Sequence, residues 1–285
     1  MRIIDAHQHV WDLDRAPYPW LGPHVAPVNR TFTFDELRPH LRQAGIRHTV
    51  LVQSADNDAD TDAMLEVAAA NPEVAAVVAY VPLDRPAEAS TRLAQLRRDP
   101  HVVGVRNLIH DLPDPDWILR PDVDEGLGVL ESAGVSFDYV AVLPRHLEHV
   151  PTICERHPDL RLVIDHLAKP PVGGTDVEPW WSLIARAAQH PLVHAKVSGL
   201  YPGEDPTGWT PDNIRPFVHR AVEVFGADRL MYGGDWPISV LAGGYDAVWA
   251  GLSEVLGDLD ESQRSEVLAG TAARFYAIDE ALLGD

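Results

Sequence analysis

Eight short apolar segments recur along the chain of 285 residues, and each is followed by a longer amphipathic stretch. Turn residues separate the two kinds of segment. The near-continuous Val, Leu, Ile and Ala content of the short segments is typical of strands that are buried on both faces of a parallel sheet. The pattern predicts strands over residues 3–9, 48–54, 74–83, 102–108, 135–142, 161–167, 193–200 and 230–237.

The amphipathic stretches predict helices, most of which end at Gly or Pro. A capping-box pair, Thr33 and Glu36, begins the first of them. The predicted helices cover residues 33–45, 58–72, 86–100, 120–134, 145–159, 179–191 and 211–226, with two more over 245–257 and 265–278.

This alternation of strands and helices predicts the fold class. Alternating strands and helices form a parallel α/β sheet. Eight such units in a chain of this length favour a (β/α)8 TIM barrel over an open doubly wound sheet, and no glycine-rich phosphate-binding motif follows the first strand. We therefore expect a single domain over residues 1–285, with the last two helices as additions to the barrel.

The charge balance narrows the classes of partner. Asp and Glu number 43 and Lys and Arg 23, which gives a formal net charge of −20. Such a surface repels nucleic acids and anionic membranes. The sequence shows no secretory signal and no apolar run long enough to span a bilayer, and its one cysteine, Cys154, cannot form an internal disulfide. We expect a cytoplasmic location.

Polar residues gather where the predicted strands end. In a (β/α)8 barrel the carboxyl ends of the strands meet at one face, where the active site lies. In chain order the strand-end residues are His7, His9, Gln53, Arg106, Asn107, Asp138, Tyr139, Asp165, His166, Lys169, Lys196, Ser198 and Asp235.

Four of these residues form a chemically coherent group. His7 and His9 are alternate residues of an extended segment and share a face. Together with His166 and Asp235 they supply three imidazoles and one carboxylate, which can bind a divalent ion, or polarise a carbonyl and activate water. Asp165 precedes His166 in the strand, so we expect it to face the other side and to cap a helix or pair with a base.

For other strand-end and loop residues the sequence leaves the role open. Gln53, Lys196 and Ser198 can be structural or functional. Two histidines of nearby loops, His24 and His110, are in a position to contact a substrate.

Six motifs in a fixed order resemble the amidohydrolase superfamily, in its branch of sugar-lactone and pyrone-dicarboxylate lactonases. They are "DAHQHVWD", "YPWL", "GVRNL…DLPDPDWIL", "DHLAKP", "KVSGL" and "YGGDWP", and they extend over nearly the whole chain. The similarity is greatest to enzymes of the L-fuconolactonase and L-rhamnonolactonase type. The resemblance implies a barrel hydrolase in which His7, His9 and Asp235 are catalytic and His166 helps to hold the lactone carbonyl.

The resemblance also bears on the metal. Binuclear members of the superfamily use a carboxylated Lys or a Glu at the fourth or fifth strand, where this chain has Arg106 and Asp138 with Tyr139. We therefore expect that the enzyme either requires no metal or binds one divalent ion, for which zinc is the first candidate. Its ligands would be His7, His9, His166 and Asp235.

The expected reaction is hydrolytic opening of a cyclic ester. Asp235 would take a proton from water, and the three histidines would stabilise the oxyanion directly or through an ion. The residues expected to orient the substrate or wall its pocket are Arg106, Tyr139, Lys169, Trp11, Trp20 and Trp236, although each Trp can equally belong to the core.

Few cations stand at the strand ends, so we expect an uncharged or weakly anionic sugar lactone as the small-molecule substrate. Three alternatives stay open: a zinc-dependent decarboxylase of an aromatic or enoic acid, a lactone isomerase, and a barrel that binds sugar acids without catalysis. The sequence also leaves open whether the chain forms a homo-oligomer.

Overall fold

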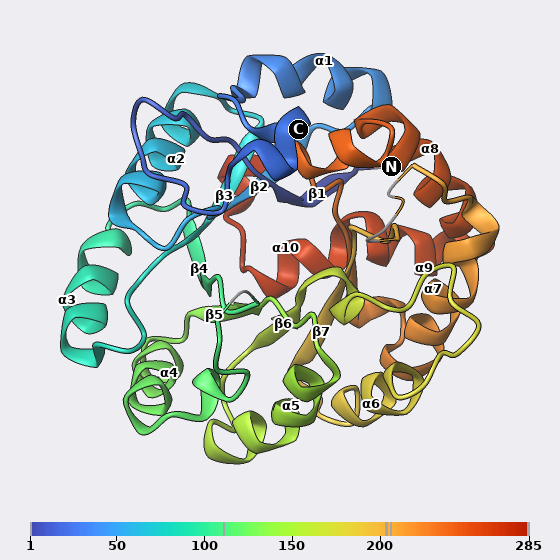
Figure 1. Cartoon of the computed structure of the whole chain (residues 1–285). Coiled ribbons are helices and arrows are strands. Elements are labelled where there is room, and N and C mark those ends of the chain that lie inside the picture. Colours follow the sequence, from blue (N-terminus) through green and yellow to red (C-terminus); the bar gives the residue numbers. More distant parts are fainter. Residues whose placement is uncertain (1, 111, 203–204, 206, 284–285) are drawn as a thin grey trace.

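Eight parallel strands form a barrel inside a ring of helices (Figure 1). The computed structural model describes residues 2–110, 112–202, 205 and 207–283. Each strand pairs with the next in chain order. The strands are β1 (Ile4–Gln8), β2 (His48–Val52), β3 (Val74–Ala79), β4 (Val102–Asn107), β5 (Ser136–Tyr139), β6 (Leu162–Ile164), β7 (Val193–Val197) and β8 (Leu230–Tyr232). The predicted (β/α)8 barrel is confirmed.

The barrel closes between the ends of its first and last strands. Gln8 forms an isolated parallel bridge with Trp236, just beyond β8. His9 N–H donates to the carbonyl oxygen of Trp236 at 2.7 Å, and Asp235 N–H donates to the carbonyl oxygen of His7 at 2.8 Å. Segments more than 220 residues apart in sequence therefore lie side by side.

The predicted helices are all present, with ends that the local sequence explains. The N–H of Thr33 donates to the Glu36 carboxylate at 3.2 Å, and the helix they begin stops at Gly45, whose φ is +70°. The helices are α1 (Phe34–Ala44), α2 (Asp58–Ala70), α3 (Pro86–Leu96), α4 (Pro121–Ala133), α5 (Pro144–Arg156), α6 (Trp180–Ala187), α7 (Pro211–Phe225), α8 (Tyr245–Leu256), α9 (Glu261–Ser265), α10 (Thr271–Phe275) and α11 (Glu280–Leu283).

Most predicted strands extend past the strands of the structure, and one predicted helix is divided. The predicted strand 74–83 ends at Ala79, because the apolar residues Val81 and Leu83 that follow are buried in a loop. The predicted helix 265–278 is divided into the end of α9, a π-helical segment over Glu266–Gly270, and α10. Apolar content marks burial, and it does not by itself mark where a strand or helix ends.

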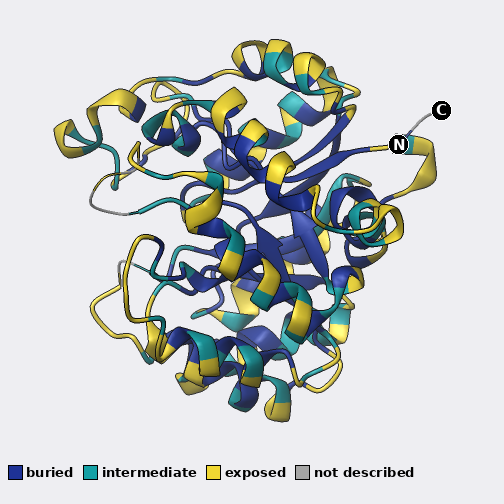
Figure 2. Cartoon of the chain, turned by 90° about the vertical axis from the view of Figure 1, so that its right-hand side faces the viewer, coloured by how far each residue is buried: buried dark blue, intermediate teal, exposed yellow. Residues whose placement is uncertain are grey.

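The core has an outer and an inner part. The outer part packs the strands against the surrounding helices, whose far faces are exposed (Figure 2). The inner part fills the barrel and is covered by the C-terminal segment around α10. Its larger members include Ile4, Val50, Val52, Val78, Val163, Met231, Phe275 and Tyr276. Among the described residues, no helix is both long and apolar enough to cross a membrane.

Candidate active site

A register shift in β1 positions the two histidines of the first motif. The shift falls between Asp5 and Gln8 in the pairing of β1 with β2. Ile4 and Ala6 pack inside the barrel, whereas His7 and His9, at the alternate positions, both direct Nε2 towards Asp235. The buried Asp5 carboxylate fixes this segment by accepting the N–H groups of His7, at 3.1 Å, and Gly234, at 2.9 Å.

Asp235 follows β8 in an unusual backbone conformation. Its φ is +53°, and two glycines precede it. A Cβ atom on Gly233 would lie 2.6 Å from the Cβ of His7, so only glycine allows the two chain segments to approach this closely. The sequence "YGGDWP" therefore serves to bring the Asp235 carboxylate next to the β1 histidines.

A left-handed turn after β6 delivers two further residues. His166, Leu167, Ala168 and Lys169 have φ values of 54°, 49°, 58° and 51°. Non-glycine residues rarely adopt this conformation in sequence, since each costs roughly 1–2 kcal/mol. The indole N–H of Trp180 donates to the carbonyl oxygen of Leu167 at 2.6 Å and helps to fix the turn. Strained backbone of this kind is concentrated at functional sites.

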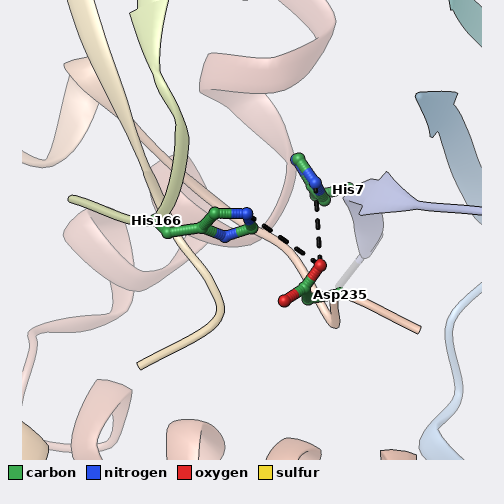
Figure 3. A group of neighbouring side chains, drawn as sticks. All are labelled: His7, His166 and Asp235. Carbon is green, nitrogen blue, oxygen red and sulfur yellow. Dashed lines mark ion pairs between the residues drawn. The ribbon is translucent and has the colours of Figure 1, made fainter. Parts of the chain in front are cut away.

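These segments bring three imidazoles around one carboxylate oxygen. Asp235 Oδ1 lies 3.6 Å from Nε2 of His9. Asp235 Oδ1 also lies 3.7 Å from Nε2 of His7 and 4.0 Å from Nε2 of His166 (Figure 3). Its other oxygen, Oδ2, accepts the Tyr201 hydroxyl at 2.7 Å. All four members of the predicted group are buried. The structure therefore brings together the group that the sequence singled out.

Each imidazole has a separate partner at its second nitrogen. Nδ1 of His9 donates to the carbonyl oxygen of Val52 at 2.7 Å, since a carbonyl can only accept. Nδ1 of His7 lies 3.3 Å from Asp165 Oδ1, and Nδ1 of His166 lies 2.8 Å from the Ser198 hydroxyl. These contacts orient all three rings with Nε2 towards Asp235.

The charges of the site follow from burial and from neighbouring groups. Burial opposes ionisation of Asp235, but His166, His9 and Lys169 outweigh it and hold the pKa of this carboxyl well below its ordinary value. Burial lowers the pKa of His166 to about 3 and also lowers the pKa of His7. At neutral pH Asp235 is therefore a carboxylate, while His7 and His166 are neutral.

An ionic network lies beneath the histidines, inside the barrel. Lys196 Nζ lies 2.5 Å from Asp138 Oδ2 and 3.1 Å from Asp165 Oδ1. Arg106 Nη1 donates to Asp165 Oδ2 at 2.9 Å, and the Tyr276 hydroxyl donates to Asp138 Oδ2 at 2.7 Å. The network thus contains two buried cations and two buried carboxylates that pair with one another.

A cavity of about 180 Å³ opens above Asp235. Its size suits a small monocyclic ligand, since drug-sized ligands occupy clefts of roughly 300–1,000 Å³. The described residues that line it are His9, Trp11, Trp20, Ser54, Arg106, Leu108, His110, Val140, Val142, His166, Lys169, Asp235 and Ile238. Larger hollows lie between surface helices, and their described lining includes neither Asp235 nor any of its three imidazoles.

Most predicted substrate contacts line this cavity, and two do not. Arg106, Lys169, Trp11 and Trp20 are part of its wall, as is His110. Tyr139 instead packs in the outer core, and its hydroxyl donates to the carbonyl oxygen of His146 at 3.0 Å. The prediction for Tyr139 is wrong because the residue after inward-facing Asp138 must face the helices.

Trp236 is likewise placed outside the cavity. Its ring packs edge-on against Phe32, with centroids 5.4 Å apart, in the outer core. It follows Asp235 directly, and the two side chains leave the backbone in different directions. His24 is exposed and does not line the cavity.

The position of Asp165 differs from the expectation that it faces the side opposite to His166. It pairs with Arg106 and Lys196, as the sequence allowed, but it does not face away from the site. The reason is that β6 already ends at Ile164, so strand alternation no longer applies at Asp165. Asp165 lies between the end of β6 and the left-handed turn, and both Asp165 and His166 face inward.

Sequence reasoning missed three features of the site. Tyr201, which bonds to Asp235, directly follows the motif "KVSGL", and this position was the available signal. Gly199 has a φ of +57°, and a Cβ there would lie within 3 Å of His166 Nδ1, Asp235 Oδ2 and Lys169 Nζ. Tyr276 comes from the far end of the barrel, and no local motif marks it.

Comparison with known proteins yields a consistent set of relatives. The family model described as amidohydrolase matches residues 4–278. L-fucono-1,5-lactonase of Burkholderia ambifaria is 38% identical over 282 residues, which cover 97% of this chain and 96% of that protein. These matches extend over the whole barrel, including every strand that contributes to the site.

Solved structures extend the comparison. An amidohydrolase from Burkholderia multivorans, crystallised with bound zinc, has a TM-score of 0.90 at 30% identity, with 98% of this chain and 100% of that chain covered. A 5-carboxyvanillate decarboxylase from Sphingomonas paucimobilis has a TM-score of 0.70 at 14% identity, with 98% and 99% covered. At that identity the second likeness shows the fold alone.

Proposed function

The chain belongs to the amidohydrolase family, and from this premise we propose that it hydrolyses the cyclic ester of a sugar-acid lactone of the L-fuconolactone or L-rhamnonolactone type. The observation that carries the proposal is the group of three imidazoles around the Asp235 carboxylate, of which His9, His166 and Asp235 itself line a cavity. The curated relative that is 38% identical is an L-fucono-1,5-lactonase.

The cavity wall fits a small sugar lactone. Trp11, Trp20, Val140 and Val142 offer apolar faces for the C–H surface of a ring. Arg106 and Lys169 are the only cationic side chains among the described lining residues, and Arg106 is already paired with Asp165. A dicarboxylate would need more unpaired positive charge than this wall provides.

Asp235 is the general base of the proposed reaction. Its carboxylate takes a proton from water, and the hydroxyl oxygen bonds to the lactone carbonyl carbon, which gives a tetrahedral oxyanion. The bond from this carbon to the ring oxygen then breaks. The departing alkoxide takes the proton back from Asp235, so the product is an open hydroxy acid and the enzyme returns to its starting state.

The histidines have different parts in this step. The Val52 carbonyl accepts the Nδ1 proton of His9, and in this tautomer Nε2 presents a lone pair that can accept a hydrogen bond from the attacking water. We therefore assign oxyanion stabilisation to His7 and His166, which donate when Nε2 is protonated. This assignment differs from the sequence-based expectation, in which all three imidazoles stabilise the oxyanion.

The same donor set fits one divalent ion. Three Nε2 atoms and a carboxylate are ligands that zinc prefers, and His7, His166 and Asp235 have ligand atoms within 4.8 Å of one another. The Val52 carbonyl at Nδ1 of His9 and the Asp165 carboxylate near Nδ1 of His7 are partners of the kind that accompany metal-binding histidines. When bound, such an ion would polarise the lactone carbonyl and acidify water. We propose at most one ion per chain, held by His7, His9, His166 and Asp235.

A pH-indicator assay tests the proposed function. L-fucono-1,5-lactone and L-rhamnono-1,5-lactone would be supplied to the full chain, with and without a chelator, and the spontaneous hydrolysis rate subtracted. We expect proton release with at least one of them. Greater activity on pyrone dicarboxylate than on every aldonolactone would contradict the proposal, as would decarboxylation of a carboxylated ring without lactone hydrolysis.

A further inference from the structure

His7 has two opposed partners at each of its ring nitrogens. At Nδ1, Lys196 Nζ lies at 3.1 Å and Asp165 Oδ1 at 3.3 Å. At Nε2, Arg106 Nη1 lies at 3.4 Å and Asp235 Oδ1 at 3.7 Å. Lys and Arg can only donate hydrogen bonds, and carboxylates can only accept them. Each nitrogen of this fully buried ring therefore faces one donor and one acceptor.

A neutral imidazole can satisfy these partners in only two ways, because it carries one N–H. In the Nδ1–H form it donates to Asp165 and leaves a lone pair at Nε2, near Arg106 and Asp235. In the Nε2–H form it accepts from Lys196 and donates towards Asp235. The two forms have the same charge, so their balance does not require a proton to enter or leave the site.

The two forms differ in what Nε2 can do. Only the Nδ1–H form has an Nε2 lone pair, which a metal ion needs. Only the Nε2–H form can donate a hydrogen bond to an oxyanion at that atom. The tautomer of His7 therefore decides between ligation of a divalent ion and direct hydrogen bonding to the substrate.

The position of Lys196 favours one of the two His7 tautomers, the Nε2–H form. Its ammonium group has three N–H donors and three acceptors nearby: Asp138 at 2.5 Å, Asp165 at 3.1 Å and Nδ1 of His7 at 3.1 Å. The contact to His7 has hydrogen-bond geometry, whereas Asp165 Oδ1 accepts no hydrogen bond from any residue that the structure describes. Lys196 is itself fully buried, so water does not compete for these donors.

We propose that Lys196 is a positioning residue that holds His7 in the Nε2–H tautomer, and that it thereby weakens the binding of a divalent ion at the site. Asp165 is the opposing residue, since it stabilises the Nδ1–H form that an ion requires. The Tyr276 hydroxyl donates to Asp138, the carboxylate that pairs with Lys196, so the C-terminal segment also helps to position Lys196.

Two variants that differ only at residue 196 isolate its role. Lys196→Met alone would leave Asp138 without its cation, so we combine it with Asp138→Asn and use Asp138→Asn alone as the matched control. Both proteins would be produced as full chains with 15N-labelled histidine and stripped of metal. Long-range 1H–15N correlation spectra report the tautomer, and the His7 signals are assigned by their loss in His7→Gln.

We expect the Nε2–H pattern for His7 in the unmodified chain and in Asp138→Asn, and the Nδ1–H pattern in the double variant. Zinc affinity, measured by competition with a chromogenic chelator, should rise about tenfold from the control to the double variant, since partners of metal-binding histidines affect affinity by roughly 10- to 100-fold. The same tautomer in both proteins, or an equal zinc affinity, would overturn the proposal.

A third variant tests the proposal in the opposite direction and does not depend on the folding of the double variant. Asp165→Asn removes the carboxylate that supports the Nδ1–H form. His7 should keep the Nε2–H pattern, and zinc affinity should fall at least tenfold. An unchanged or higher zinc affinity would refute the role of the network. None of these measurements uses turnover, so they stand apart from the test of lactone hydrolysis.

Discussion

The two ends of the barrel interior contain opposite kinds of side chain on the same strands. At the amino ends, Ile4, Val50 and Met231 pack with Phe275 from the C-terminal segment. At the carboxyl ends, imidazoles, carboxylates and two cations are buried together around Asp235. The amino-end half of the barrel interior, here called the lower half, buries apolar surface, which stabilises the fold. The carboxyl-end half, here called the upper half, buries charge, which rarely adds net stability. The comparison shows that residues that stabilise the fold and residues that form the candidate active site occupy opposite ends of the strands.

The largest expected effect comes from the upper half. Asp235→Asn keeps the shape of the side chain but cannot take a proton, so kcat for lactone hydrolysis should fall by about 10²- to 10⁴-fold while KM changes less. The rate and the melting temperature would be measured on the same protein. A variant with a much lower melting temperature and a normal rate of lactone hydrolysis would mean that the role of Asp235 is structural.

The matching change in the lower half is Phe275→Ala. Phe275 is buried and its ring lies 4.9 Å from that of Tyr276 and 4.7 Å from that of His194. Its truncation should lower the free energy of unfolding by about 3–5 kcal/mol, because a large cavity is left.

Urea denaturation measures this loss, and Phe275→Leu, which removes less volume, serves as the control. In the protein that stays folded, kcat should be nearly unchanged. A Phe275→Ala protein with intact stability and a strongly reduced kcat would break the proposed separation of the two halves.

A smaller effect is expected from Tyr201→Phe in the upper half. The hydroxyl of Tyr201 donates to Asp235 Oδ2 at 2.7 Å and so directs Oδ1 towards the imidazoles. Loss of one hydrogen bond to a charged group costs about 1.5 kcal/mol, which is roughly tenfold in kcat.

Steady-state kinetics would measure this change, and KM should remain similar. Tyr139→Phe provides the control, because it removes a tyrosine hydroxyl that bonds to His146 outside the cavity. Equal kcat values for the two variants would show that the Tyr201 hydroxyl does not assist Asp235.

The smallest expected effect is a pH dependence in the lower half. Burial lowers the pKa of His194 from 6.5 to about 4. Between these values the unfolded chain binds a proton that the folded chain does not, so the stability contributed by this residue is present above pH 6.5 and is lost as pH falls towards 4.

His194→Gln should therefore reduce the loss of stability between pH 7 and pH 5, by on the order of 1 kcal/mol. Urea denaturation at the two pH values would measure it. His24→Gln, at an exposed position, is the control. Should both variants lose stability with the same slope as the unmodified chain, His194 would have no part in the acid sensitivity.

The fold could be predicted almost completely from the sequence because each strand and helix has a local signal. Continuous apolar segments mark the strands, and Gly or Pro marks most helix ends, as at Gly45. The extents of several elements were wrong, as in the predicted strand 74–83, where buried loop residues continue the apolar pattern. The short helix α11 was not predicted.

The site was predictable in part. His7, His9, His166 and Asp235 could be identified because strand ends converge in a barrel. The orientation of Tyr139 and Asp165 could not, because it depends on where a strand stops. Tyr276 could not be found at all, since its contact with Asp138 joins residues 138 positions apart through the barrel interior.

The closure of the barrel between β1 and β8 has a consequence for biosynthesis. The ribosome adds roughly 5–20 residues per second, so on the order of ten to fifty seconds separate the synthesis of His7 from that of Asp235. During this interval the first strand has no neighbour on one side. We expect nascent chains to rely on chaperones until β8 emerges. A circular permutant that begins within a surface loop would move this interval to another pair of strands, while residues 7 and 235 would be made closer together in time.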